Sequence, residues 1–213
     1  MNKAPNTRQR LVEAAKVSVL EKGFGATSID ELIAEVNITK SGFFYHFKDK
    51  GELARALLED YIEEEEKLLD DIFDRGRDLA DDPLQAFLIS LKLLARTVED
   101  LPEGHPGCLI ATYCYQERLF DHTVRELNRN AVLGWRARFR AIFEDISARY
   151  PPREEIDLDV LADMVSTILE GGIVMSKALG TPRILPQQVL LFRNMMRAMF
   201  LPDAQLSRAP AAG

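Results

Sequence analysis

The chain has 213 residues, enough to bury a hydrophobic core without a disulfide or a metal ion to stabilise it. Apolar residues make up 46% and charged residues 29%, which is typical of a folded globular protein and excludes a disordered one. The net charge of -7 is uneven, because residues 1–50 carry eight Lys/Arg against six Asp/Glu, while residues 51–213 carry 19 against 28. No apolar run reaches the roughly 20 residues of a membrane span, and the N-terminal sequence lacks a signal peptide's apolar stretch, so we expect a cytoplasmic protein with no membrane partner.

Helical periodicity runs through the whole chain, because apolar spacings of three and four recur and strand-like alternation is absent. The sequence therefore predicts an all-α fold of about nine helices. The first helix is expected over about 7–22, and the second begins at Ser28, with Glu31 as its capping-box partner. Asn37 then occupies a turn, since Asn tolerates left-handed backbone better than most residues, and a short third helix is expected over 39–47.

A long fourth helix is expected over about 49–74, followed by a polar loop over 76–83. The remaining helices are expected over 83–98, 108–118, 121–148, 155–179 and 186–200. The segment 202–213 is rich in Ala, Pro and Ser, and we expect a flexible tail there.

Three short helices within the first 50 residues, two of them joined by a tight turn, are typical of a helix-turn-helix domain. The third helix and its flank, TKSGFFYHFKDK over 39–50, combine small residues with hydrogen-bond donors. Small residues let a backbone approach a DNA groove, and Lys40, Tyr45, His46 and Lys50 have the reach to contact phosphates. We therefore expect a DNA-binding domain over 1–50, followed by a helical domain over 51–201.

Residues 7–58 resemble the DNA-binding domain of the TetR family of bacterial transcriptional regulators. The resemblance is carried by four segments: LVEAA at 11–15, EKGF at 21–24, TSI at 27–29 and ITKSGFFYHFKDKGEL at 38–53. It implies that the helix over 39–47 is the recognition helix and that double-stranded operator DNA is the partner.

The resemblance also implies roles for single residues. Phe43 and Phe47 match core positions, and Phe44 stands where the family usually has Tyr, so one hydroxyl contact is missing. Asn37 replaces the usual turn Gly. The residues expected at the DNA are Ser28, Thr39, Lys40, Ser41, Gly42, Phe44, Tyr45, His46 and Lys50.

In this family the last two long helices form a four-helix bundle in a homodimer, which the resemblance carries over to the helices expected over 155–179 and 186–200. The pair Gly171-Gly172 costs about 2 kcal/mol of helix propensity relative to Ala, which is easier to explain if another helix packs closely there. A dimer would place two recognition helices about 34–36 Å apart on a palindromic operator. The residues expected at this interface are Val165, Ile168, Gly171, Gly172, Met175, Val189, Phe192, Met196 and Met199.

The body helices also offer side chains for a small-molecule effector site, since pockets are mostly apolar with a few placed polar groups. The candidates are Cys108, Thr112, Tyr113, Tyr115, Gln116, Trp135, Phe139 and Met175. The same side chains would serve equally well as a helical core, and the sequence leaves both interpretations open. We expect a homodimeric repressor that such a ligand releases from its operator.

Cys108 and Cys114 lie six positions apart on one expected helix and face different sides, which excludes a disulfide between them. Cys108 begins that helix, where the dipole favours a thiolate, so a thiol- or electrophile-sensing regulator is the alternative function. We favour small buried hydrophobes at both positions. The sequence has neither metal-ligand spacing nor a nucleophile–base pair, so we expect no metal, no cofactor and no enzyme activity; a small helical enzyme is a remote alternative.

Overall fold

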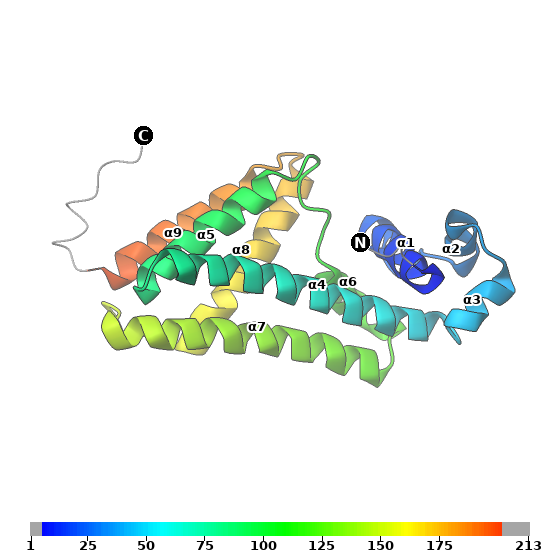
Figure 1. The fold of residues 1–213 in the computed structure, drawn as a ribbon, viewed down its shortest axis with the longest axis horizontal. Coiled ribbons are helices and arrows are strands. Elements are labelled where there is room, and N and C mark those ends of the chain that lie inside the picture. The colour runs from blue at the N-terminus through cyan, green and yellow to red at the C-terminus, as the bar shows by residue number, and fades with distance from the viewer. Residues whose placement is uncertain (1–5, 202–213) are drawn as a thin grey trace. The chain divides into compact units, whose positions relative to one another are not determined.

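The fold is known from a computed structural model that describes residues 6–201. These residues form nine α-helices and one short 3-10 helix, with no strand among them, which confirms the predicted all-α class (Figure 1). The tail predicted over 202–213 lies outside the described residues. The helices are α1 (Thr7–Lys22), α2 (Ile29–Val36), α3 (Lys40–His46), α4 (Lys50–Leu79), α5 (Pro83–Glu99), α6 (Leu109–Tyr115), η1 (Glu117–Leu119), α7 (His122–Arg149), α8 (Leu158–Ala178) and α9 (Ile184–Phe200).

The contacts divide the chain into two compact units. Unit 1 holds the described residues up to Lys67 together with Pro106–Val132, and unit 2 holds Leu68–His105 together with the described residues from Leu133 onward. Unit 1 is larger than the predicted DNA-binding domain, because α6, η1 and the first part of α7 group with the N-terminal helices. The functional division at residue 50 stays a prediction.

Unit 1 has a core built from one face of each short helix. α1 packs against α2 and α6, and α2 packs against α3. Leu11 of α1, Leu32 of α2 and Phe43 of α3 are all buried. Burying a Leu or Phe side chain stabilises a fold by about 1.5–3 kcal/mol, so this shared core holds the three helices at fixed angles.

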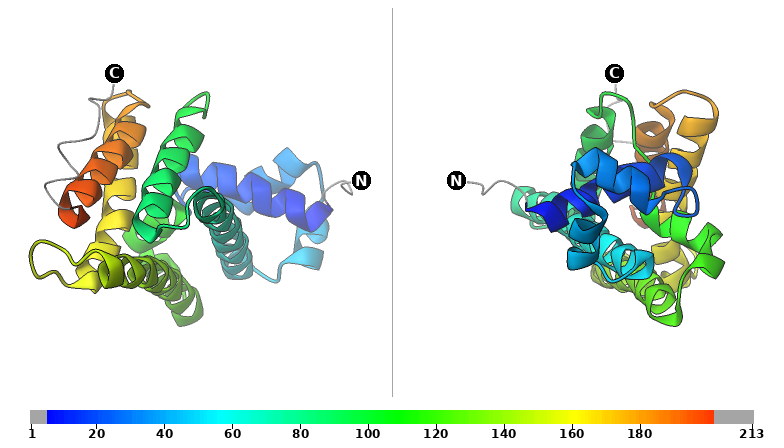
Figure 2. Two further views of the ribbon diagram at one scale, coloured as in Figure 1. Left: turned by 60° about the vertical axis from the view of Figure 1, so that its left-hand side comes forward. Right: turned by 90° about the vertical axis from the view of Figure 1, so that its right-hand side faces the viewer.

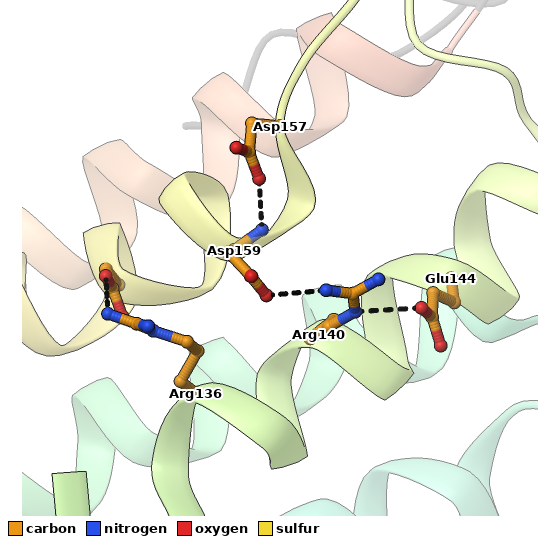
Figure 3. Close-up of polar contacts among 6 residues, drawn as sticks. Arg136, Arg140, Glu144, Asp157 and Asp159 are labelled. Atoms are coloured by element: carbon orange, nitrogen blue, oxygen red, sulfur yellow. Dashed lines mark hydrogen bonds and ion pairs between the residues drawn. The ribbon is translucent and has the colours of Figure 1, made fainter. Parts of the chain in front are cut away.

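Unit 2 is a helical layer in which α9 lies beside both α5 and α8 (Figure 2). Ion pairs tie α7 to α8: Arg136 donates two hydrogen bonds to Asp163, at 2.8 and 2.7 Å. One turn along, Arg140 bonds Asp159 at 2.8 Å (Figure 3). All four side chains are partly exposed, so solvent screens both ion pairs, and they mainly fix the register of the two helices.

The predicted end of the fourth helix near residue 74 is wrong, because α4 continues to Leu79. Gly76, which suggested a loop, is instead the point where α4 touches α5. A Cβ atom at this glycine would lie 2.0 Å from the Ser90 Oγ and 2.7 Å from the Ala86 carbonyl oxygen. The glycine is needed for close helix packing, and this tertiary contact overrides its poor helix propensity.

Candidate nucleic-acid interface

The turn between α2 and α3 is fixed by capping hydrogen bonds. At the start of α2, the Ser28 Oγ accepts a hydrogen bond from the Glu31 amide and the Glu31 carboxylate accepts one from the Ser28 amide, both at 3.1 Å. Asn37 ends α2 in the left-handed region, with φ 54° and ψ 57°. The Thr39 Oγ1 then caps α3 by accepting from the Gly42 amide at 3.1 Å. The two caps and the Asn turn confirm the local geometry that the sequence predicted.

Helix α3 has one buried face and one exposed face. Phe43 and Phe47 point into the core, as the sequence predicted. On the other side Tyr45 is 85% exposed and Phe44 is 46% exposed. The exposed members of the predicted DNA-contacting set on this segment are Thr39, Lys40, Ser41, Phe44 and Tyr45, while Gly42 and His46 are half-buried. Hydroxyl, cationic and aromatic groups are thus available together on one rigid element.

Two lysines flank this face. Lys40 has a weak ion pair, and Lys50 uses one of its N–H donors within the chain. The Lys40 Nζ lies 3.4 Å from the Asp30 carboxylate, and both side chains are exposed, so a phosphate can replace this partner at little cost. The Lys50 Nζ donates to the Phe24 carbonyl oxygen at 2.6 Å and lies 4.3 Å from the Phe24 ring centre. Burial lowers the pKa of Lys50. An ammonium group has three N–H donors, so two remain after the Phe24 contact.

Residues of α6 and of the two positions that flank η1 hold the loop between α1 and α2, a role that the sequence did not reveal. The Gln116 Oε1 accepts a hydrogen bond from the Gly25 amide at 3.0 Å. The Phe24 ring packs against Phe120 at 4.8 Å and against Tyr113 at 6.1 Å between ring centres. These contacts join residues about 90 positions apart and leave no periodic signal in the sequence.

The residues predicted to form an effector pocket divide between the two units. Tyr113 is buried and its hydroxyl donates to the Ala54 carbonyl at 2.8 Å, while Tyr115 is 82% exposed. Gln116 holds the α1–α2 loop, and Thr112 bonds the Cys108 carbonyl at 3.0 Å. Three further candidates belong to unit 2: Trp135 is half-buried, Phe139 lies in the core and Met175 is exposed. The role of this set as an effector pocket stays a prediction.

The residues predicted to form a dimer interface also divide. Five of them are buried within unit 2, so they are not available to contact a second copy of the chain: Val165, Gly172, Val189, Phe192 and Met196. A Cβ atom at Gly172 would lie 2.8 Å from a Leu185 side-chain atom, so this glycine serves α8–α9 packing within the chain. Gly171 and Met175 are exposed, and Ile168 and Met199 are half-buried.

The cysteines differ in exposure, and the expectation of two buried thiols is wrong for Cys114. Cys114 is exposed, and its Sγ accepts a hydrogen bond from the Asn128 Nδ2 at 3.2 Å. Cys108 is half-buried beside the Tyr61 hydroxyl. The thiol-sensing role of Cys108 stays a prediction. Within residues 6–201 no group of three or more His, Cys, Asp or Glu side chains is placed to hold a metal ion.

A short helix that exposes polar and aromatic side chains, fixed by a left-handed turn against a capped partner helix, defines a helix-turn-helix DNA-binding regulator. Residues 11–57 match the family model described as "Bacterial regulatory proteins, tetR family". The match identifies residues 11–57 as a DNA-binding domain of the TetR type.

Similarity to known regulators extends beyond this domain. The transcriptional regulator AcuR of Cereibacter sphaeroides is 26% identical over 172 residues, which cover 79% of this chain and 75% of AcuR. The repressor BdcR of Escherichia coli is 26% identical over 163 residues, covering 76% and 75% of the two chains. A TetR-family regulator from Agrobacterium tumefaciens shares the fold, with a TM-score of 0.75 at 17% identity over 92% of this chain and 98% of that one. No helix in the described part of the chain is long and apolar enough to cross a membrane.

Proposed function

We propose that the protein is a homodimeric repressor that inserts α3 into the major groove of a palindromic operator and leaves it when a small ligand binds. The observation that carries this proposal is the division of α3 between the buried Phe43 and Phe47 and the exposed face that includes Tyr45. The two buried phenylalanines hold the helix against the core, and its exposed face is available to contact DNA. Relatives named as transcriptional regulators and, in the case of BdcR, as a repressor support the same function.

An apolar surface on α8 and α9 supports the dimer. Its members are Val174, Met175, Leu179, Leu190, Leu191 and Met195, all exposed in the single chain. Gly171 adds an open position, because no atom lies within 4 Å of where its Cβ would be. Exposed apolar side chains that gather into one patch are typical of protein–protein contact sites. A second copy offers the same surface, and such self-complementary contacts generate two-fold dimers.

The dimer is tested by placing a charge within this surface. Leu191→Glu should convert the dimer into a monomer in sedimentation, because the new carboxylate would be buried without a partner. Leu79→Glu is the matched control, since Leu79 is also an exposed leucine (66%, against 53% for Leu191) and lies at the end of α4. A Leu191→Glu variant that remains a folded dimer would contradict the proposed interface.

Operator binding is tested by selecting bound sequences from random duplex DNA with the purified full-length protein. We expect a palindrome whose half-site centres lie about 10–10.5 base pairs, or a multiple of that, apart. Tyr45→Ala should then weaken binding about tenfold or more, because a hydrogen bond to a charged phosphate contributes roughly 1.5–3 kcal/mol. Tyr115→Ala, at a tyrosine of the same exposure outside the predicted interface, should bind as wild type. Equal affinities of the two variants would refute the role of α3.

A further inference from the structure

The N-terminal end of α1 is joined to the helix-turn-helix by two arginine side chains. The Arg10 Nη2 donates a hydrogen bond to the Val36 carbonyl oxygen, at the end of α2, over 2.7 Å. The Arg8 guanidinium lies over the Phe47 ring, with 5.1 Å between its central carbon and the ring centre. Phe47 is the residue at which α3 ends. The first residues of α1 and the C-terminal end of the predicted recognition helix are therefore neighbours.

Arg8 keeps its hydrogen-bond donors available. Its side chain is exposed, and among residues 6–201 it contacts the Phe47 ring without forming an ion pair or a side-chain hydrogen bond. A guanidinium has five N–H donors, and a contact with the face of a ring uses none of them. The ring also restricts the positions that the side chain can take, so less conformational freedom is lost when a ligand binds.

The charges beside Arg8 favour an anion. The first turn of α1 contains no acidic residue. Lys48, which follows Phe47 directly, is exposed and has no ion pair among the residues that the structure describes. The next residue, Asp49, uses its carboxylate to cap α4, by accepting a hydrogen bond from the Glu52 amide at 2.8 Å. Two cations without an ion-pair partner thus adjoin the same end of α3.

This end of α3 is part of the predicted DNA-contacting surface. Tyr45 is exposed, and its ring meets the His46 ring edge-on with 5.0 Å between the centres. Arg8 reaches the neighbouring Phe47 from a different helix, and it lies before the segment 11–57 that matches the family model. The contact with Phe47 is tertiary, so no motif or periodicity in the sequence indicated it.

We infer that the Arg8 guanidinium binds a backbone phosphate of the operator beside the C-terminal end of α3, which extends the DNA interface to α1. The inference rests on the proposed function, because it adds a contact to the complex that α3 forms. Arginine suits this role, since its planar fork of donors matches two oxygens of one phosphate. Phosphate contacts fix the position of a protein on the duplex without reading its sequence. Arg8 therefore helps to orient α3 in the groove.

The test removes single phosphate charges from the DNA. One symmetric pair of phosphates at a time is replaced by neutral methylphosphonates in the selected operator, and fluorescence anisotropy measures how tightly the full-length protein binds each duplex. Neutralising a contacted pair should weaken wild-type binding about tenfold or more. In Arg8→Met, one such pair should lose its effect to within about twofold, while the other pairs keep theirs. In Arg8→Lys, which keeps the charge, that pair should retain part of its effect.

Arg118→Met is the matched control, because Arg118 is an exposed arginine of η1 without an ion pair among the described residues. Its map of sensitive phosphates should equal that of the wild type. An Arg8→Met map equal to that of the wild type would overturn the inference and would show that Arg8 only covers Phe47. A uniform loss of sensitivity at all pairs would overturn it as well. A wild type that selects no palindrome would instead contradict the proposed function, so the two failures are distinguishable.

Discussion

Lys50→Met removes the positive charge of Lys50 and keeps an unbranched side chain of similar length, so it tests the role of the charge in DNA binding. The methionine side chain keeps an unbranched apolar stem over the Phe24 ring, while the ammonium group that lies 4.3 Å from the ring centre is lost. The hydrogen bond to the Phe24 carbonyl is lost too, which should reduce the free energy of unfolding by about 1 kcal/mol. The two N–H donors that the Phe24 contact leaves available are the ones we expect at a phosphate.

The expected effect on DNA binding follows from counterion release. Each phosphate contact adds about 0.9 to the magnitude of the slope of log affinity against log salt concentration. A dimer that loses two contacts should therefore have a slope that is smaller in magnitude by about 1.8. Between 50 and 200 mM salt, the wild type should therefore lose about twelvefold more affinity than the variant. The loss should be similar for the selected operator and for random duplex, because phosphate contacts do not depend on sequence.

Fluorescence anisotropy of labelled operator and random duplex across this salt range measures both effects. Lys67→Met is the control, because Lys67 is an exposed lysine further along α4 that pairs with Glu63 on its own helix. Its salt slope should match the wild type. A folded Lys50→Met variant with an unchanged slope would show that Lys50 only braces the α1–α2 loop, and the phosphate role would be refuted.

Gly76→Ala should lower the free energy of unfolding by about 1–3 kcal/mol, because the added methyl would overlap Ser90. Gly134→Ala is the control and should raise the free energy of unfolding by up to about 1 kcal/mol, since its Cβ would meet nothing within 4 Å. Equal effects of the two changes in chemical denaturation would contradict the close α4–α5 contact. Burial, reinforced by the Glu64 carboxylate, raises the pKa of Glu65 above its ordinary value of 4.5. Between pH 4.5 and the folded pKa, the folded chain therefore keeps a proton on Glu65 that the unfolded chain releases. The protonated carboxyl thus stabilises the fold; its contribution is fully present below pH 4.5 and is lost as the pH rises through the folded pKa. Glu65→Gln should accordingly raise Tm at pH 7 with little change at pH 4, and an equal shift at both values would argue against the raised pKa.

The sequence predicted the helix-turn-helix well because its signals are local. The capping box at Ser28, the left-handed Asn37 and the Thr39 cap each act within four residues, so the boundaries of α2 and α3 follow from side-chain chemistry. Gly76 misled the prediction for α4, because its role depends on a contact with α5 that no local pattern encodes.

The residues predicted for the dimer interface show why an apolar stripe alone does not locate an interface. An apolar stripe indicates that a helix face is buried, but it does not indicate what covers the face. The stripe through Phe192 and Met196 is covered by the chain itself, and the exposed apolar face of α9 lies at neighbouring positions such as Leu191 and Met195.

The central claim is that the exposed face of α3 touches the bases of an operator, and a change of specificity tests it most directly. Selection from random DNA should be repeated with Lys40→Ala, whose side chain is exposed and lies 3.4 Å from the Asp30 carboxylate. We expect the same palindrome with base preference relaxed at one symmetric pair of positions. A motif identical to that of the wild type would show that Lys40 does not read the operator, and a motif lacking two-fold symmetry in both proteins would contradict the account as a whole.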